Sequence, residues 1–546
     1  MDLFNFKYIF KQRLNFIFGV IVLIFIILIS KYFYLQIIKF DTYSSLAKTN
    51  RIKIIPIPAL RGQILDRNGE ILAANKLIYT LEINPKQKLD LNKIKDKLRG
   101  VVDITKYDIK KYEKILRDSH YSSTLPIKSN LTNKQVAKFV SKQYKYPNIF
   151  LKEKFSRTYP KMKSGAHFIG HINRINKEDI KRLKKTNNFQ SYKGLDHIGK
   201  TGIEFFYEDK LHGFPGYKKI EVDANNNVIR TIDTVLPIHG EDITLNIDYK
   251  IQRTAEKSFG NYKGAMVVLD PNNGEVLAYV SQPSYDPNLF TNGIDESNWE
   301  RLNNSIHKPL VNRVISGVYP PGSTLKPFVA LAGLENNVRR PPFTIFDKGF
   351  YNMPNQSKTF KDWKKGGHGE VDMIKAIAVS CDTFFYGLGV ELGIPKLNIV
   401  LKRFGFGKKT NIDLPNEKKG LIASAQWKKN KYNKKWFQGE TAITAIGQGY
   451  TQTTPIQLAL ATAKLINLDY KISPKILRKT TVPKFMQISK INRDRQNEDL
   501  NIIKKGMALV TKEGGTAAFI GRTSTYNVSA KTGTAQVFGL KKDEVY

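Results

Sequence analysis

The 546-residue chain has a single cysteine, Cys381, and this scarcity excludes several kinds of site. One chain can form no internal disulfide, and it can form no zinc or iron–sulfur site built from four cysteines. Acidic residues are also few, because Asp and Glu total 48 against 88 Lys and Arg, for a formal net charge of +40. With 41% hydrophobic and 25% charged residues, the composition is that of a globular chain and excludes collagen-like and fully disordered proteins.

The excess of basic charge does not by itself identify a partner. The lysines are spread from end to end and are not gathered on one helix or arm, so we do not predict nucleic-acid binding. A basic surface is compatible with an anionic lipid surface or an anionic wall polymer.

Long hydrophobic runs are absent except for one near the N-terminus. Leu14–Ser30 has 17 residues without a charge, and the apolar run resumes after Lys31 and ends at Ile38. Bulky residues follow Ser30, so a signal-peptidase site is missing. The run is preceded by three basic residues, Lys7, Lys11 and Arg13. They favour a cytoplasmic N-terminus at 1–13. Together with the missing cleavage site, this predicts an uncleaved membrane anchor at 14–38, with the bulk of the chain outside the cytoplasm.

The rest of the chain divides into two regions, at 41–240 and 244–546. The first mixes strands and helices, with a hairpin over Arg61–Ala73 that turns at Asn68-Gly69. The second has a predicted helix at Asp248–Ser258, a hairpin at Ala265–Ser281, a helical middle at Ser323–Ile466 and a strand at Asn527–Val537. The pattern predicts an α+β fold, with helices segregated from a sheet.

Three short motifs in the second region carry reactive side chains. Ser323 and Lys326 fall at the start of a predicted helix and share one of its faces. A serine hydroxyl becomes a nucleophile when a nearby base takes its proton, and a lysine serves as that base only when it is neutral. Taken alone, Ser-x-x-Lys is more often a helix cap beside a surface lysine. Ser380-Cys381-Asp382 and Lys531-Thr532-Gly533-Thr534 follow in order and argue against coincidence.

The three motifs resemble the S-x-x-K, S-x-N/D and K-T-G motifs of the penicilloyl-serine transferases. The wider pattern resembles the class B penicillin-binding proteins, most closely the elongation-specific penicillin-binding protein 2 branch. That likeness also rests on the N-terminal anchor and on segments spread along the chain: Arg61–Gly69, Gly202–Glu204, Asp270–Gly274, Ser380–Tyr386, Gly447–Gln457 and Lys531–Val537. The resemblance implies a membrane anchor, an elongated pedestal (dimerisation-like) domain and a transpeptidase domain.

The resemblance also implies a peptidoglycan D,D-transpeptidase with a role for each motif residue. Ser323 would attack a D-Ala-D-Ala stem peptide, with Lys326 as the general base and Ser380 as the proton relay. Asp382 would orient Lys326 or the substrate, and Lys531 would add positive potential. Substrate binding would fall to Thr532, Gly533 and Thr534, and the backbone N–H groups of Ser323 and Thr534 would form the oxyanion hole. β-Lactams would acylate Ser323. We expect no cofactor for this catalysis.

A candidate metal site is formed by Asp347, Asp362, His368 and Cys381. Spacing alone leaves open an ordinary buried thiol and a surface histidine. Two carboxylates, an imidazole and a thiolate suit a closed tetrahedral zinc site. Some members of the penicillin-binding protein 2 branch carry zinc on matching residues, and by this resemblance we expect a structural zinc ion.

Partners and location are implied by resemblance alone. They are peptidoglycan stem peptides, β-lactams, a RodA-type SEDS glycosyltransferase and an MreC-like protein, for a single-pass protein of the bacterial inner membrane with most of its chain in the periplasm. The family continues past the K-T-G strand with further strands and a helix, so a transpeptidase domain whose sequence ends at Tyr546 is expected to lack its C-terminal part. Alternatives are a truncated non-catalytic scaffold, a β-lactamase or β-lactam sensor, and the division-specific paralogue.

Overall fold

A computed structural model describes residues 3–83, 91–118, 124–186, 188–192, 195–223, 228–354, 357–478 and 493–535. The chain forms two compact units. The first comprises Met1–Leu60, Asn176–Asp196 and Gly213–Gly240, and the second comprises Arg61–Ile175, His197–His212 and Glu241–Tyr546.

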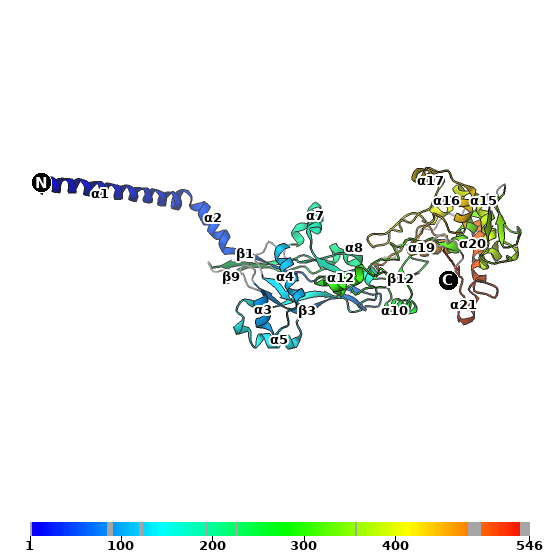
Figure 1. The fold of residues 1–546 in the computed structure, drawn as a ribbon, viewed down its shortest axis with the longest axis horizontal. Coiled ribbons are helices and arrows are strands. Elements are labelled where there is room, and N and C mark those ends of the chain that lie inside the picture. The colour runs from blue at the N-terminus through cyan, green and yellow to red at the C-terminus, as the bar shows by residue number, and fades with distance from the viewer. Residues whose placement is uncertain are drawn as a thin grey trace. The chain divides into compact units, whose positions relative to one another are not determined.

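The first unit begins with a long apolar helix, α1 (Leu3–Phe33), which continues into a π-helical turn at Tyr34–Ile38 (Figure 1). The stretch Phe10–Ile38 is long and apolar enough to cross a membrane, and none of its most apolar window is buried. Among the described residues, the bent pair α15 (Asp382–Leu392) and α16 (Ile394–Arg403) passes the same test only if counted as one span. Most of that pair is buried in a protein core, so α1 alone fits an anchor.

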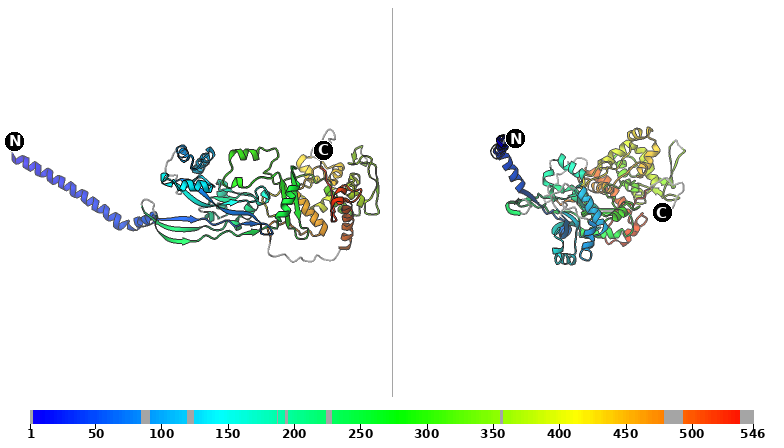
Figure 2. Two further views of the ribbon diagram at one scale, coloured as in Figure 1. Left: turned by 90° about the horizontal axis from the view of Figure 1, so that it is seen from below. Right: turned by 60° about the vertical axis from the view of Figure 1, so that its left-hand side comes forward.

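A three-stranded antiparallel sheet follows the anchor. Helix α2 (Phe40–Arg51) leads directly into β1 (Ile52–Ile57), which pairs with β8 (Gly216–Val222), and β8 pairs in turn with β9 (Val228–Val235). These strands run side by side in Figure 2. The unit also contains α7 (Lys177–Lys185) and a 3-10 turn at Phe189–Tyr192.

The second unit opens with the predicted hairpin. Strands β2 (Ile64–Leu65) and β3 (Ile71–Ile83) pair antiparallel around a turn in which Gly69 has a φ of +87°. A carboxylate oxygen of Asp66 accepts the backbone N–H groups of Asn68 and Glu70, each at 2.8 Å, and this closes the turn. The sheet is completed by β4 (Leu125–Lys128), β5 (Ile149–Thr158) and β10 (Ile243–Thr244).

The second predicted hairpin is also present in this unit. Strands β11 (Gly264–Leu269) and β12 (Val276–Gln282) pair antiparallel. Helix α10 (Tyr249–Ser258) packs on β12, and α19 (Pro455–Asn467) packs on β11. The side chain of Asp248 accepts the backbone N–H groups of Lys250 and Ile251 and so caps α10. The helix and the hairpin are therefore confirmed.

The expected helical middle is interrupted by two small ladders. Strand β13 (Ile345–Asp347) pairs with β16 (Gly369–Val371), and β14 (Phe350–Asn352) pairs with β15 (Thr359–Lys361). Helices α13 (Lys326–Glu335), α14 (Met373–Ala378), α15 and α16 pack beside them around a core of Leu, Phe, Val and Ala side chains. The remaining elements of the unit are α3 (Leu91–Leu98), α4 (Lys106–Asp118), α5 (Asn133–Val140), a 3-10 turn (Gln143–Lys145), α6 (Ala166–Ile169), β6 (Ile172–Arg174), β7 (His197–Gly199), α8 (Gly202–Phe206), α9 (Glu208–Leu211), α11 (Asn288–Thr291), α12 (Glu296–Asn303), a 3-10 turn (Gly322–Leu325), α17 (Ala425–Tyr432), α18 (Gln438–Ala445), α20 (Arg493–Leu509) and α21 (Ala518–Thr523).

The strand expected at Asn527–Val537 is wrong for the residues described, because 527–535 contain no strand. Among the described residues this stretch pairs with no strand: Gly533 and Ala535 line a cavity of about 670 Å³ that β11 residues such as Ala265 and Val267 also line. The stretch is held by α20 instead, since the Ala530 N–H donates to the carbonyl of Met507 at 3.0 Å. Residues 536 and 537 lie outside the described residues.

Candidate active site and metal centre

Ser323 lies in the 3-10 turn at Gly322–Leu325, which leads directly into α13. The turn is tied to the loop before α19 through paired hydrogen bonds between the backbones of Tyr319 and Thr453. Gly322 has a φ of +56°, and its N–H donates to the carbonyl of Gly447 at 2.9 Å. The half-buried Ser323 is thereby placed at the tip of a buried helix.

Lys326 is fully buried and lies against the second motif. Its Nζ atom donates to the Ser380 carbonyl at 2.7 Å, and it forms an ion pair with Asp382 at 2.6 Å. The Ser380 hydroxyl is 3.3 Å from the same nitrogen. Among the described residues, no hydrogen bond joins Lys326 to the Ser323 hydroxyl. The structure thus places Lys326 between the first two motifs, paired with Asp382.

Ser380 connects the second motif to the third. It follows α14, is 5% exposed and has a φ of +59°, which is unusual for a residue with a side chain. Lys531 donates to its hydroxyl at 2.9 Å. Burial, reinforced by the positive charge of Lys326 and opposed by the negative charge of Asp382, lowers the pKa of Lys531 to about 7. Near neutral pH, much of Lys531 is therefore uncharged.

The K-T-G stretch also packs directly on the Ser323 turn. A Cβ added to Gly533 would lie 2.7 Å from the Thr324 methyl group, and one added to Gly322 would clash with the Thr534 carbonyl. Thr532 shares a 2.7 Å hydroxyl hydrogen bond with Thr516. The Thr534 carbonyl accepts from Gln448 at 3.0 Å. The three sequence-distant motifs therefore meet in one place.

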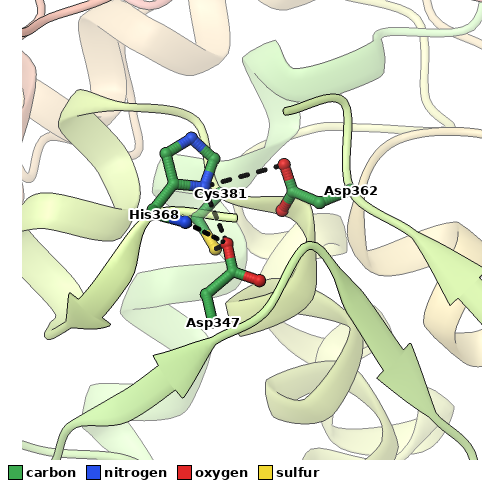
Figure 3. A group of neighbouring side chains, drawn as sticks. All are labelled: Asp347, Asp362, His368 and Cys381. Atoms are coloured by element: carbon green, nitrogen blue, oxygen red, sulfur yellow. Dashed lines mark hydrogen bonds and ion pairs between the residues drawn. The ribbon is translucent and has the colours of Figure 1, made fainter. Parts of the chain in front are cut away.

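The four candidate metal ligands also meet, as Figure 3 shows. One ligand atom from each of Asp347, Asp362, His368 and Cys381 lies within 4.8 Å of the others. Asp347 is the last residue of β13, and Cys381 is the N-cap of α15. Asp362 follows β15, and His368 precedes β16.

The donor set fits a tetrahedral metal ion. His368 Nδ1 is 2.8 Å from Asp347 and 3.7 Å from Asp362, and the Cys381 sulfur is 3.4 Å from Asp347. Neighbouring ligand atoms around a tetrahedral zinc ion are about 3.3–3.8 Å apart, given its bond lengths, so two of the three separations match and the contact between His368 and Asp347 would have to lengthen by about 0.5 Å. All four side chains are buried. Burial, together with the charges of Asp362 and Asp347, raises the pKa of the Cys381 thiol, and a metal ion bound here would favour its thiolate form.

Two contacts at the site involve residues to which the motifs assign no role. Gln448 belongs to the Gly447–Gln457 segment, but nothing in the sequence indicates that its amide reaches Thr534. Trp363 directly follows Asp362, and its indole N–H donates to the Ser380 carbonyl at 3.1 Å. In the sequence, only its position next to a predicted metal ligand could have drawn attention to it.

A buried lysine beside a serine turn, a second serine and a K-T-G segment define an active-serine acyltransferase of the penicillin-interacting class. Two family models match the chain: "Penicillin binding protein transpeptidase domain" over residues 264–546 and "Penicillin-binding Protein dimerisation domain" over residues 56–245.

The relatives agree with both matches. The peptidoglycan D,D-transpeptidase MrdA of Acinetobacter baumannii is 38% identical over 99% of this chain and 80% of its own length. The peptidoglycan D,D-transpeptidase MrdA of Escherichia coli K12 is 40% identical over 95% of this chain and 83% of its own length. Helicobacter pylori penicillin-binding protein 2 in complex with MreC superimposes with a TM-score of 0.75 at 32% identity, covering 89% of each chain. The chain belongs to the class B penicillin-binding proteins and is a serine-type peptidoglycan D,D-transpeptidase of the penicillin-binding protein 2 branch.

A further solved structure comes from work on "a peptidoglycan synthase complex" that coordinates polymerization and crosslinking. It superimposes with a TM-score of 0.68 at 25% identity, covering 96% of this chain and 89% of the other. The resemblance inferred from the sequence and the α+β fold are confirmed.

Proposed function

We propose that Ser323 is the nucleophile that carries the acyl group of the stem peptide. The observation that carries this assignment is the meeting of the three motifs, in which the Ser323 turn touches Gly533 and Thr534 while Lys326 and Lys531 share the Ser380 hydroxyl. The hydroxyl attacks the carbonyl between the terminal D-alanines, the D-alanine amine leaves, and an amine from a second stem peptide takes the acyl group.

Lys326 accepts the Ser323 proton, and Ser380 passes a proton toward the leaving amine. In the structure Lys326 is paired with Asp382, and a lysine acts as a base only in its neutral form. The Ser380 hydroxyl lies 3.3 Å from Lys326 and 2.9 Å from Lys531, an arrangement that suits a relay between the two amines. Because the pKa of Lys531 is about 7, Lys531 can both take and return a proton at neutral pH.

Substrate binding falls to the K-T-G stretch. Gly533 and Thr534 are exposed, and Gly533 allows close approach of a substrate backbone. Thr532 and Thr534 offer hydroxyl groups to the terminal carboxylate. The backbone N–H groups of Ser323 and Thr534 form the oxyanion hole, where loss of one donor typically costs about 3 kcal/mol.

The test is labelling with fluorescent penicillin. The unchanged chain should be labelled covalently, and Ser323→Ala should not be labelled although it retains the same thermal unfolding midpoint. Labelling that persists in a folded Ser323→Ala protein would refute the nucleophile assignment. A folded unchanged chain that does not label would favour the non-catalytic scaffold, and rapid release of the label would favour a β-lactamase.

We further propose that Asp347, Asp362, His368 and Cys381 hold a structural zinc ion. The ion would fix the β13–β16 and β14–β15 ladders to the start of α15, which directly follows Ser380. We expect about one zinc per chain by elemental analysis, less in Cys381→Ala, and a lower unfolding midpoint after chelation. A protein purified without chelators that contains no stoichiometric zinc would contradict this proposal.

We propose the inner membrane as the location, with the part of the chain after Ile38 in the periplasm. The span Phe10–Ile38 and the basic residues before it support this orientation. Protease added to spheroplasts should digest the chain beyond the anchor. Digestion that requires membrane lysis would contradict it.

We propose that the partners of this chain are an MreC-like protein and a RodA-type glycosyltransferase. This proposal is supported by the similarity to a penicillin-binding protein 2 solved with MreC and to a chain of a peptidoglycan synthase complex. Co-purification of each partner from membranes tests it. The absence of both from the purified material would count against it.

A further inference from the structure

Trp363 lies at the turn that carries Ser380, although the proposed mechanism gives it no role. Its indole N–H points at two carbonyl groups, those of Ser380 at 3.1 Å and Val379 at 3.2 Å. The residue is nevertheless 59% exposed. A tryptophan that is largely exposed does not need a protein partner for its indole N–H, which water can accept. The contact of this N–H with the backbone of the Ser380 turn therefore indicates a role in that turn.

The Ser380 backbone is in a conformation that needs support. A φ of +59° is unfavourable for a residue with a Cβ atom, and it persists only where the neighbours fix it. The Ser380 carbonyl accepts from Lys326 at 2.7 Å and from Trp363 at 3.1 Å. A carbonyl oxygen has two lone pairs, so these donors together satisfy it. The peptide group after Ser380 is therefore held from two directions.

The carbonyl carbon and the side chain are both attached to the Ser380 Cα atom, so fixing this peptide group restricts where the hydroxyl can lie. That hydroxyl is within reach of both Lys531 and Lys326. Without the indole donor, Lys326 alone would hold the carbonyl, while the same nitrogen also pairs with Asp382. The spacing between the two lysines and the hydroxyl would then become less defined.

Trp363 has further contacts, through its ring and through the residue before it. Its ring lies 5.5 Å from that of His368, at an interplanar angle of 56°. The carboxylate of the preceding residue, Asp362, accepts the backbone N–H groups of Asp382 at 2.7 Å and Thr383 at 2.9 Å. The indole is thus attached to the same segment that it supports, on both sides of Ser380.

We propose that Trp363 is a positioning residue for acylation: its indole N–H holds the Ser380 carbonyl and thereby sets the distances among Lys326, Ser380 and Lys531. This inference rests on the proposed roles of Ser323 and Ser380. It concerns the rate of the chemical step and not the binding of the ligand.

The test separates the N–H group from the ring. Full-length chain in detergent is compared with Trp363→Phe and with a chain carrying 3-benzothienylalanine at position 363, in which sulfur replaces the N–H. Stopped-flow acylation by a fluorescent penicillin gives the dissociation constant and the acylation rate constant separately. Both variants should lose about tenfold in the rate constant, as expected for one hydrogen bond, with less than a twofold change in the dissociation constant. Trp299→Phe, at a 43% exposed tryptophan on α12, should leave both constants unchanged.

Three results would overturn the proposal. If the benzothienyl chain acylates at the parent rate, the N–H group has no role. If the dissociation constant rises while the rate constant holds, Trp363 contacts the ligand instead. If the unchanged chain is not acylated at Ser323, the proposed nucleophile is wrong and this inference falls with it, a failure recognised because the parent and not the variant is inactive.

Discussion

At the scale of single residues, the site depends on how two lysines and one carboxylate share a buried space. Lys326 is fully buried and paired with Asp382, whereas Lys531 lacks a carboxylate at contact distance among the described residues and is instead bound to the Ser380 hydroxyl and the Thr532 carbonyl. The two lysines therefore differ in their partners despite their proximity. A sequence motif gives the residue types but not this division, because the division depends on burial and on distances to partners.

The lowered pKa of Lys531 predicts a pH dependence of stability. Its pKa is about 7 in the folded chain and 10.5 when unperturbed, so between these values the unfolded chain binds more protons. The contribution of Lys531 to stability is therefore least favourable below pH 7 and improves as the pH rises toward 10. Relative to Lys531→Met, the unfolding midpoint of the parent should rise by about 2 °C between pH 7 and pH 9.5.

Differential scanning fluorimetry of the two proteins at matched ionic strength measures this difference. Other titrating groups are common to both chains and cancel in the comparison. A difference between the midpoints that is constant from pH 7 to pH 9.5 would mean that Lys531 keeps an ordinary pKa.

At the scale of elements, close backbone contact joins the Ser323 turn to the K-T-G stretch. Gly322 has a φ of +56°, and any Cβ there would clash with the Thr534 carbonyl. Gly322→Ala should push the two segments apart and reduce the acylation rate by about 100-fold, the loss associated with displacement of reacting groups by about 1 Å.

Gly100→Ala is the matched control for this substitution. Gly100 also has a positive φ, +81°, but no atom lies within 4 Å of its added Cβ. Alanine at either position is strained by the positive φ, at a cost of about 1–2 kcal/mol. Only Gly322→Ala also has the clash with the Thr534 carbonyl. Acylation measured at equal folded fractions should therefore separate them. Equal acylation rates in the two variants would contradict the proposed contact.

The same scale shows what the sequence can and cannot predict about the elements. The hairpin over Arg61–Ala73, the helix after Asp248 and the hairpin at 265–281 were predictable because capping residues, turn residues and alternation are local signals. The absence of a strand at 527–535 was not predictable, because a stretch becomes a strand only where a neighbouring strand elsewhere in the chain pairs with it. The grouping of Asp347, Asp362, His368 and Cys381 was anticipated through resemblance, since their spacing alone is uninformative.

At the scale of the whole molecule, the second compact unit includes residues from both family domains. One apolar core contains Ile64 and Leu72 of the dimerisation-type segment together with Val276, Tyr279 and Val314 of the transpeptidase segment. A pedestal that shares a core with the catalytic region can transmit strain to it, because packed interiors deform little. Composition alone contains no sign of this shared core.

The second unit contains a buried cluster of charges around Glu204. Glu204 is fully buried and pairs with Arg157 and Arg61, each at 2.6 Å, and Arg61 also pairs with Glu208 at 2.7 Å. The Arg157 guanidinium donates to the Gly62 carbonyl as well. The cluster thus joins β5, the segment before β2, and helices α8 and α9.

Removing the central carboxylate should destabilise the whole second unit. Glu204→Gln leaves two buried guanidinium groups without their shared counterion, and breaking such a buried pair typically costs about 3–5 kcal/mol. Glu241→Gln is the control, because Glu241 forms a 3.1 Å ion pair with Lys210 but its side chain is 61% exposed. That change should cost about 1 kcal/mol or less. Denaturant unfolding followed by penicillin labelling of the folded fraction would measure both losses.

The same cluster predicts sensitivity to acid. Burial by itself would raise the pKa of Glu204, but the charges of Arg157 and Arg61 outweigh burial and lower it. A carboxyl whose pKa is lowered on folding contributes stability above its unfolded pKa, and that stability is lost as the pH falls through the folded value. The parent should therefore have a larger free energy of unfolding than Glu204→Gln at neutral pH. This difference should disappear only in acid, well below pH 4.5. If the two proteins differ equally at pH 7 and pH 3, or do not differ at pH 7, the charge cluster does not hold the unit together.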